Sequence, residues 1–335
     1  MNAKELKHVL EGLIESKIPT FLWGNPGVGK SSVVSQIANE HDMEFVDLRL
    51  SLLDPTDLRG IPFFDKDEKS AVWAKPEFLP KSESEVKGIL FLDEINSAPP
   101  TIQAAAYQLI LDRKIGEYNL PKNFAIVAAG NYESDRGVTY RMPTPLANRF
   151  VHLDFDVDFE SWKDWAIKRG IDKRIVSFLS YKNENLFAFD PKSNKKAFAT
   201  PRSWEFVDGI LKSNIPQSSL EGVIGGAIGN SSAVEFLNYA EVMDELPNIG
   251  DILDGKLVKI PTKNSALFGM CVGIVYALKK DFTVERLTNV LKFTIELNDE
   301  FSMMLIRDMQ RDEIDLELSP YWKEWVDAHR YLISM

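Results

Sequence analysis

Residues 24–31 read Gly-Asn-Pro-Gly-Val-Gly-Lys-Ser, a complete G-x-x-x-x-G-K-[ST] phosphate-binding loop. The loop follows a short apolar segment at residues 21–23 and precedes a helix-favouring stretch that begins at Ser31. A loop that passes from a strand end to a helix start directs backbone N–H groups, and the positive end of the helix dipole, toward bound phosphate. The sequence therefore predicts a nucleotide site on an α/β fold.

The residues of this loop divide the work of holding a triphosphate. The glycines at 24, 27 and 29 let the backbone approach the phosphates because no Cβ intervenes. The Lys30 ammonium would contact the β- and γ-phosphate oxygens, and the Ser31 hydroxyl would bind Mg²⁺. We predict that the nucleotide-binding residues are Gly24, Asn25, Pro26, Gly27, Val28, Gly29, Lys30, Ser31 and Ser32.

The composition limits the class of protein. The 335-residue chain has a formal net charge of −11 and a single cysteine, Cys271, so it cannot form an intramolecular disulfide. An acidic chain disfavours a broad surface for phosphate backbones, and nucleic acid is therefore not the favoured partner. The N-terminus lacks a secretory pattern, and the longest uncharged run, 265–278, is shorter than the ~18 residues that a spanning helix needs. We expect a cytoplasmic protein without a membrane span.

The pattern along the chain predicts the architecture. Strand-like segments at 44–50, 88–92, 124–129 and 150–155 are separated by helical segments. Together with 21–23, they predict a five-stranded parallel sheet covered by helices. From Asp158 onward the pattern is helical. We therefore predict an αβα nucleotide-binding core over residues 1–198, and a helical lid with a C-terminal helical region over residues 199–335.

Three polar side chains follow predicted strands. Asp93 and Glu94 come after the apolar run 89–92. Asp93 would bind Mg²⁺ directly or through a water, while Glu94 would polarise the water that attacks the γ-phosphate. Asn131 follows the strand at 124–129, where it could orient that water or contact the γ-phosphate, since ligands bind at the carboxyl ends of parallel strands. A turn-capping role is the alternative for Asn131.

Several motifs together resemble the MoxR family of AAA+ ATPases over roughly residues 6–237. After the phosphate loop come ILFLDEIN, APPTIQAAAYQLILD, AIVAAGN, MPTPLANRF and TPRSWEF, in that order. The resemblance implies an AAA+ P-loop core followed by an α-helical lid. It also implies a Mg²⁺-dependent, ATP-hydrolysing chaperone or remodelling enzyme that acts on protein partners as a homo-hexamer. Partners with a von Willebrand factor A domain are implied in the same way.

The resemblance also assigns an arginine finger. Arg149, in the ANRF segment, corresponds to the finger that reaches the γ-phosphate bound by a neighbouring subunit, so the active site would be shared between adjacent subunits. The chain departs from the common family pattern at Asn148, where the family has Asp. Arg136 and Arg141 lie near the same expected edge and stay open as rival fingers.

A second arginine is assigned by the TPRSWEF segment. Arg202 corresponds to the sensor 2 residue, which reports the nucleotide state to the lid. The alternative is a structural role, because Arg202 could pair with Glu205 three residues further along the same helix.

The segment at about residues 54–80 is too long for a simple crossover loop. Residues 61–64 and 71–74 flank the charged, turn-forming DKDEKS and predict a hairpin. This hairpin resembles the helix-2 insert of the MoxR-like clade, which faces the pore of the ring, and residues 114–120 lie where that clade has a second hairpin. Phe63 and Phe64 are either substrate contacts or packing residues of the hairpin.

Two other functions compete with a protein-remodelling ATPase. A nucleic-acid-dependent AAA+ motor of the replication or restriction type is the alternative, although the acidic composition counts against it. A nucleotide-gated scaffold that does not hydrolyse ATP is the third possibility, which the presence of Glu94 and Arg149 disfavours. Salt-dependent DNA binding would distinguish the nucleic-acid motor from the protein-remodelling ATPase.

The C-terminal part, from about Asp244, matches no motif. Apolar residues at helical spacing in this part predict packed helices. Tyr321, Trp322, Trp325 and Tyr331 form an aromatic cluster that either packs on other helices or presents a surface to a partner.

Overall fold

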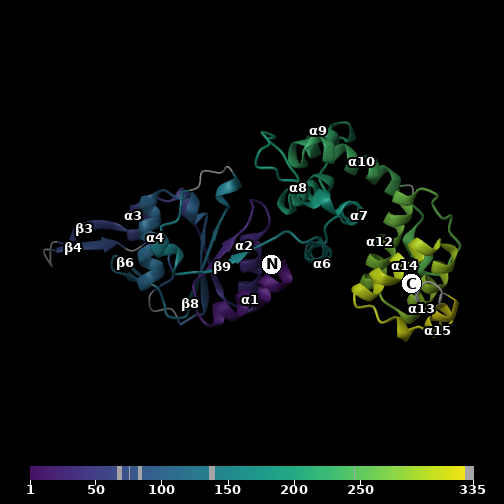
Figure 1. Cartoon of the computed structure of the whole chain (residues 1–335), viewed down its shortest axis with the longest axis horizontal. Coiled ribbons are helices and arrows are strands. Elements are labelled where there is room, and N and C mark those ends of the chain that lie inside the picture. The colour runs from purple at the N-terminus through teal and green to yellow at the C-terminus, as the bar shows by residue number, and fades with distance from the viewer. Residues whose placement is uncertain (66–69, 75, 82–84, 136–139, 245, 329–335) are drawn as a thin grey trace. The chain divides into compact units, whose positions relative to one another are not determined.

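The computed structural model describes residues 1–65, 70–74, 76–81, 85–135, 140–244 and 246–328. The chain divides into two compact units (Figure 1). The first unit comprises Met1–Ser161 with Asp190–Asn194, and the second comprises Trp162–Phe189 with Lys195–Met335. The units thus divide near residue 161. The sequence-based assignment of a core over 1–198 and a lid over 199–335 stays a prediction about roles.

A five-stranded parallel sheet forms the centre of the first unit, as the sequence predicted. Its strands are β1 (Thr20–Trp23), β2 (Glu44–Arg49), β5 (Gly88–Asp93), β8 (Phe124–Gly130) and β9 (Val151–Asp154). They lie in the order β2-β5-β8-β1-β9, and each pair is parallel. The carboxyl ends of all five strands therefore meet at one edge, and β8 lies between the phosphate-loop strand β1 and the acidic strand β5.

Helices bury the apolar side chains of the sheet. The helices of the first unit are α1 (Ala3–Glu15), α2 (Lys30–Glu40), α3 (Pro55–Arg59), α4 (Pro100–Asp112) and α5 (Thr144–Ala147), with short 3₁₀ turns η1 (Leu50–Leu52), η2 (Ile95–Ser97) and η3 (Glu133–Asp135). Strand β8 is buried along its whole length. The apolar run that sequence reading identified in this strand is thus explained, because side chains on both of its faces are covered.

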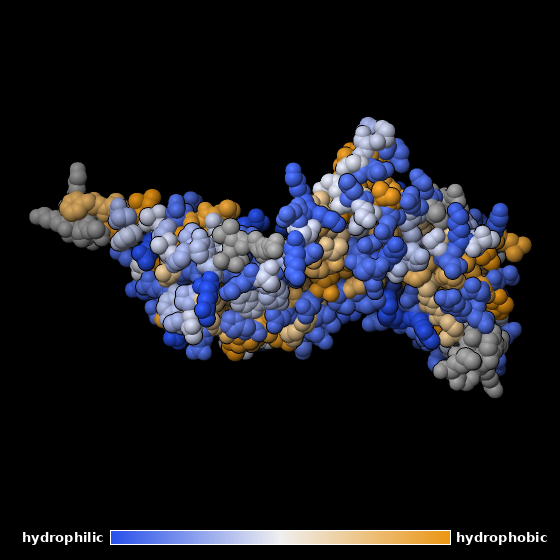
Figure 2. Space-filling model, turned by 45° about the horizontal axis from the view of Figure 1, so that its top comes forward, coloured by the Kyte–Doolittle hydropathy of each residue, from blue (hydrophilic) through white to orange (hydrophobic). Residues whose placement is uncertain are grey.

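Two small hairpins accompany the sheet. The first pairs β3 (Ile61–Asp65) with β4 (Ser70–Ala74), and the second pairs β6 (Lys114–Ile115) with β7 (Tyr118–Asn119), so both predicted hairpins are present. The first extends away from the five-stranded sheet (Figure 1). Ile61, Phe63 and Phe64 are 67%, 51% and 65% exposed. Figure 2 shows hydrophobic surface at the end of the molecule where this hairpin lies. The two phenylalanines therefore do not pack the hairpin onto the sheet.

The second unit is helical. Its helices are α6 (Phe159–Arg169), which begins in the first unit, α7 (Lys173–Tyr181), α8 (Pro201–Leu211), α9 (Gln217–Ile228), α10 (Asn230–Asp244), α11 (Ile249–Leu253), α12 (Asn264–Lys280), α13 (Val284–Phe293), α14 (Asp299–Arg311) and α15 (Trp322–Ala328), with 3₁₀ turns η4 (Asn183–Leu186), η5 (Thr294–Glu296) and η6 (Leu316–Leu318). No helix in the described ranges has the length and hydropathy needed to cross a membrane.

The predicted C-terminal helical stripes are core positions, except for Val284, which is 43% exposed. Met270 and Ile274 of α12 pack in one apolar cluster with Leu287 and Leu291 of α13. Trp325 is fully buried, stacks on Trp322 at 5.2 Å, and donates through Nε1 to the Thr294 hydroxyl at 2.7 Å. The aromatic cluster therefore packs among the helices at these positions, whereas Tyr331 lies outside the described residues.

Candidate nucleotide-binding site

The phosphate loop occupies the turn between β1 and α2. Strand β1 ends at Trp23, and α2 begins at Lys30. Gly29 precedes the helix with φ of 102°, in the left-handed region that a residue with a Cβ adopts only with strain. This turn leaves the first N–H groups of α2 without intrahelical partners, which is the arrangement that binds phosphate at a helix N-terminus.

Lys30 lies at the centre of the site and is 9% exposed. Its Nζ donates to the backbone oxygens of Gly24 at 2.7 Å and Asn25 at 3.1 Å. It also donates to Oδ1 of Asn131 at 2.9 Å. The strand order explains the last contact, because β8 adjoins β1 and delivers Asn131 beside the loop. Two residues predicted separately from sequence, 101 positions apart, are thus in direct contact.

The acidic pair lies at the end of β5. Glu94 has φ of 56°, an uncommon left-handed conformation for a residue with a side chain. Its carboxylate accepts a hydrogen bond from the Ser51 hydroxyl, which belongs to η1 at the end of β2. Backbone strain of this kind persists where surrounding contacts enforce it, and it occurs most often at functional sites. The turn directs Glu94 away from β5, toward the end of the neighbouring strand.

The electrostatics of Asp93 suit a bound cation. Burial raises the pKa of Asp93, an effect opposed by the Glu94 backbone N–H at 2.9 Å and by the Lys30 charge, and reinforced by Asp47 and Glu94. A carboxylate whose charge is not fully compensated gains stability from a nearby Mg²⁺. Within the described ranges no group of three His, Cys, Asp or Glu side chains could hold a metal. Mg²⁺ instead commonly uses one or two carboxylates together with substrate phosphates, which fits Asp93 with the Ser31 hydroxyl.

Asn96 joins the ends of β5 and β8. Its Nδ2 donates to the Asn131 backbone oxygen at 2.7 Å, and its own backbone oxygen accepts from Tyr140 N at 2.6 Å. This approach requires the glycine at 130, because a Cβ there would lie 2.3 Å from Asn96 Oδ1. Asn96 is buried, and its hydrogen bond connects the turn after β5 to the backbone at Asn131.

Asp135 holds the phosphate loop from the other side. Asn25 Nδ2 donates to Asp135 Oδ1 at 2.9 Å, and Tyr132 N donates to Asp135 Oδ2 at 3.2 Å. Burial raises the pKa of Asp135, and the hydrogen bonds from Tyr132 and Asn25 and the Lys30 charge oppose that effect. The polar side chains of the site therefore share partners across β1, β5 and β8.

The remaining predicted loop residues follow the same turn. Val28 is buried, Ser31 is half-buried in the first turn of α2, and Ser32 is exposed. Gly27 has a positive φ of 79°, and Pro26 is half-buried. Roles for these residues toward a nucleotide stay predictions.

The predicted arginines lie in different parts of the chain. Arg149 is exposed just after α5 in the first unit, and its guanidinium has no hydrogen bond or ion pair with the residues that the structure describes. Arg141 is exposed as well, whereas Arg136 lies outside the described residues. Arg202 is exposed in the first turn of α8 in the second unit. Burial raises the pKa of Glu205, and Arg169 and Arg202 oppose this effect.

Sequence reading missed three residues that organise the site: Ser51, Asp135 and the side chain of Asn96. Asn96 ends the acidic motif, and Asp135 follows Asn131 by four residues, so their places near known motifs were the available signal. Ser51 had no such signal, because its partner Glu94 is 43 positions away.

Comparisons with known proteins agree with this geometry. Residues 20–152 match the family described as "ATPase family associated with various cellular activities (AAA)". This range contains the phosphate loop, the acidic pair, Asn131 and Arg149. The first unit therefore contains a nucleotide-binding ATPase domain of the AAA+ class.

Two curated relatives narrow the class. Chaperone MoxR1 of Mycobacterium tuberculosis is 28% identical over 151 residues, which cover 44% of this chain and 38% of the relative. Midasin of Giardia intestinalis is 31% identical over 156 residues, which cover 44% of this chain and 3% of the relative. The chain thus covers much less than two thirds of either relative. Over these residues the chain is similar to both a MoxR chaperone and midasin.

Solved structures show more distant similarity. A RuvB mutant of Thermotoga maritima is 19% identical with a TM-score of 0.41, and the match covers 75% of this chain and 74% of that one. NtrX of Brucella abortus in complex with ADP is 15% identical with a TM-score of 0.42, and the match covers 92% and 67%. Similarity at this level places no individual residue.

Proposed function

We propose that the chain is an ATP-hydrolysing remodelling enzyme whose reaction takes place at the carboxyl edge of the five-stranded sheet. The observation that supports this most is the contact between Lys30 Nζ and Asn131 Oδ1 at 2.9 Å, beside the strand that ends in Asp93 and Glu94. A phosphate-binding cation, an amide and two carboxylates thus converge from three adjacent strands. This set provides what phosphoryl transfer to water needs.

The proposed roles follow from the chemistry of each group. Ser31 and Asp93 would hold Mg²⁺, which neutralises charge on the phosphates when bound. Lys30 would exchange its contacts with the loop for β- and γ-phosphate oxygens. Glu94 would accept a proton from the attacking water, and it becomes available for this once the Ser51 hydrogen bond opens. Asn131 would orient the same water.

Arg149 would act on the nucleotide of a neighbouring subunit. The Arg149 guanidinium is exposed and forms no hydrogen bond or ion pair with the described residues, so it is suited to reach another chain. An arrangement in which each copy supplies a finger to the next is heterologous and closes as a ring, for which we propose a hexamer. Arg202 would report the nucleotide state from the helical second unit.

The proposed client is a protein in the cytoplasm. The relative from Mycobacterium tuberculosis is named a chaperone, and this chain has exposed Ile61, Phe63 and Phe64 on its β3–β4 hairpin. Exposed apolar side chains of this size mark contact surfaces for other proteins. A partner with a von Willebrand factor A domain would fit the family resemblance.

Replacement of Glu94 by Gln tests this proposal. We expect Glu94→Gln to bind ATP as the wild type does and to hydrolyse it about 10²- to 10⁴-fold more slowly, because the general base is lost. Glu117→Gln, at an exposed position in the β6–β7 turn, is the matched control and should retain full turnover. Unchanged turnover of Glu94→Gln would refute the assignment.

The same variant distinguishes the kinds of client. Loaded with ATP, Glu94→Gln should retain a protein client during affinity purification from the source cells. Stimulation of wild-type ATP turnover by DNA, lost at high salt, would instead favour a nucleic-acid motor.

A further inference from the structure

Three rings lie in a row beside the end of β1, which leads into the phosphate loop. Tyr132 follows β8, Trp23 ends β1, and His152 belongs to β9. Trp23 stacks on Tyr132 with 6.2 Å between ring centroids and on His152 with 6.1 Å. This row begins one residue after Asn131 and includes the residue that immediately precedes Gly24. It therefore joins the two segments that contact Lys30.

His152 uses both of its ring nitrogens. Its Nδ1 accepts a hydrogen bond from Trp23 Nε1 at 2.9 Å. An indole nitrogen only donates, so Nδ1 has no proton and the proton of the neutral ring is on Nε2. That Nε2 lies 2.8 Å from the backbone oxygen of Ala147 and donates to it. The two contacts thus determine one tautomer of His152.

The second contact reaches the segment that bears Arg149. Ala147 is the last residue of α5, a helix of only four residues, and Arg149 follows two positions later. Leu146 of this helix is buried, and Arg149 N donates to its backbone oxygen at 3.0 Å. The His152 hydrogen bond adds a connection from α5 to the sheet. On the other side, Phe155 N donates to the Trp23 backbone oxygen at 2.8 Å, which fastens β9 to the start of the phosphate loop.

We propose that His152 is a positioning residue for Arg149, which it places by donating to the Ala147 carbonyl. The inference rests on the proposed function of Arg149 as a finger for the neighbouring subunit. His152 contacts no nucleotide-binding residue directly. His152 therefore affects the active site of the next copy, through Arg149. Its ring nevertheless lies against Trp23, beside the phosphate loop of its own subunit.

Two substitutions separate the two hydrogen bonds. His152→Gln places an amide nitrogen at the position of Nε2 and retains the bond to Ala147, whereas His152→Asn places an oxygen at the position of Nδ1 and retains only the bond from Trp23. We expect His152→Asn to lower kcat ~10- to 100-fold, because a displacement of about 1 Å at a catalytic group has effects of this size. His152→Gln should retain most of the turnover.

The affinity for ATP distinguishes positioning from damage to the loop. Because Lys30 and Ser31 are untouched, both variants should keep the wild-type dissociation constant for ATP and the wild-type KM. Two results would show that His152 supports its own phosphate loop and would overturn the inference. In the first, His152→Asn retains turnover and His152→Gln loses it. In the second, the affinity for ATP falls together with kcat.

Mixed assemblies provide the deciding test. In a mixture of His152→Asn with Lys30→Ala, the Lys30→Ala copies supply well-placed fingers to the intact phosphate loops of the other copies. We expect ATP turnover to recover, as it should for Arg149→Ala mixed with Lys30→Ala. If only the mixture of Arg149→Ala with Lys30→Ala recovers turnover, the role of His152 is overturned and the role of Arg149 as a finger is retained. Recovery in neither mixture would overturn the shared site, and the inference with it.

Discussion

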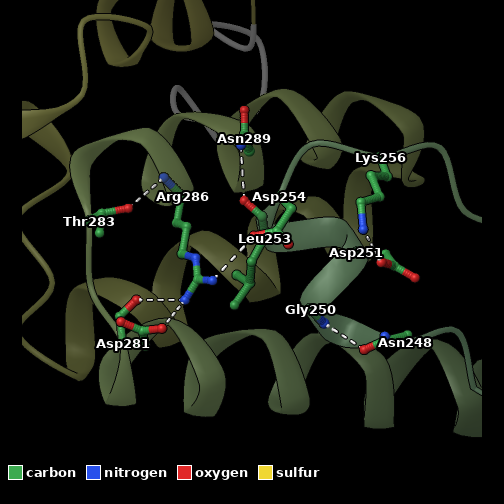
Figure 3. Close-up of polar contacts among 10 residues, drawn as sticks. All are labelled: Asn248, Gly250, Asp251, Leu253, Asp254, Lys256, Asp281, Thr283, Arg286 and Asn289. Carbon is green, nitrogen blue, oxygen red and sulfur yellow. Dashed lines mark hydrogen bonds and ion pairs between the residues drawn. The ribbon is translucent and has the colours of Figure 1, made fainter.

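The carboxyl edge of the sheet and the C-terminal helices use polar side chains in opposite ways. At the edge, hydrogen bonds join residues far apart in sequence, such as Lys30 with Asn131 and Trp23 with His152. Around α11 and α13 in the second unit, most of the polar contacts instead join residues at most five positions apart (Figure 3). Asn248 caps α11 at Gly250 N, and Thr283 caps α13 at Arg286 N, two and three positions away.

Two polar contacts of this region reach further along the chain and join helices. Arg286 reaches Asp254 at 3.2 Å as well as Asp281, and Asn289 donates to the Leu253 backbone oxygen at 2.9 Å (Figure 3). These contacts fasten the end of α11 to α13 above an apolar core. The comparison indicates two roles for polar groups. Those that come together from separate strands, and can exchange their partners, belong to the candidate site. Those that complete local turns or join helices stabilise the fold.

The largest effect is expected at Lys30. Lys30→Ala removes charge-assisted hydrogen bonds to the phosphates, and we expect ATP affinity to fall by roughly 10²- to 10³-fold. The control is Lys256→Ala, which removes the ion pair with Asp251 in the second unit. Titration calorimetry should show unchanged ATP binding for the control. Equal losses in both variants would break the distinction between the two regions.

Gly130→Ala tests how tightly the edge is packed. The added Cβ would lie 2.3 Å from Asn96 Oδ1, so Asn96 must move and its bond to Asn131 is lost. We expect the free energy of unfolding to fall by about 1–3 kcal/mol. Gly12→Ala, in α1 with no atom within 4 Å of the new Cβ, should instead stabilise by about 0.5–1 kcal/mol. Denaturant unfolding measures both, and equal stabilities would contradict the packing described.

Asp93→Asn tests whether the buried Asp93 charge lowers the stability of the nucleotide-free fold. Burial raises the pKa of Asp93 above its ordinary value of 3.8, so the folded protein favours the neutral carboxyl. The charge therefore destabilises the fold at pH values above the raised pKa, and the penalty declines as the pH falls through it.

Without nucleotide at neutral pH, Asp93→Asn should thus melt at a higher temperature than the wild type, and this difference should shrink on acidification. The variant should also lose most of the stabilisation that Mg²⁺ with ATP gives the wild type. A lower melting temperature of the nucleotide-free variant would show that the Asp93 charge is already compensated.

The smallest effect is expected at Arg286. Arg286→Ala removes exposed ion pairs to Asp281 and Asp254, and such pairs contribute little to stability. ATP turnover should be unchanged, and the melting temperature should fall only slightly. A marked loss of turnover would show that this cluster has a role that its local contacts do not indicate.

The three central strands β1, β5 and β8 could be predicted because strands buried on both faces are continuous apolar runs, whereas the edge strands β2 and β9 are partly exposed and have a mixed pattern. The five predicted strands have bounds within one residue of those in the structure, and the hairpins at 61–74 and 114–120 are present. Site residues that belong to recognisable motifs, such as Lys30 and Glu94, were also found from the sequence. The convergence of Lys30 and Asn131 also followed from the parallel sheet, since carboxyl ends share an edge.

The supporting contacts could not be predicted in this way. Ser51 and Asp135 form hydrogen bonds with residues 43 and 110 positions away, and His152 accepts one from Trp23, 129 positions away. Serine, aspartate and histidine are common on any surface, so their types gave no signal. Only the strand order β2-β5-β8-β1-β9, with β8 inserted between β5 and β1, brings them to their partners.

The account rests on a nucleotide site completed by Arg149 of a second copy, and a mixing experiment tests this directly. Arg149→Ala and Lys30→Ala should each be almost inactive alone, whereas a one-to-one mixture should regain turnover, because about a quarter of the sites in a random ring combine an intact loop with an intact finger. Co-assembly of the two variants, shown by their mass in solution, without any recovery of ATP turnover would contradict the shared site.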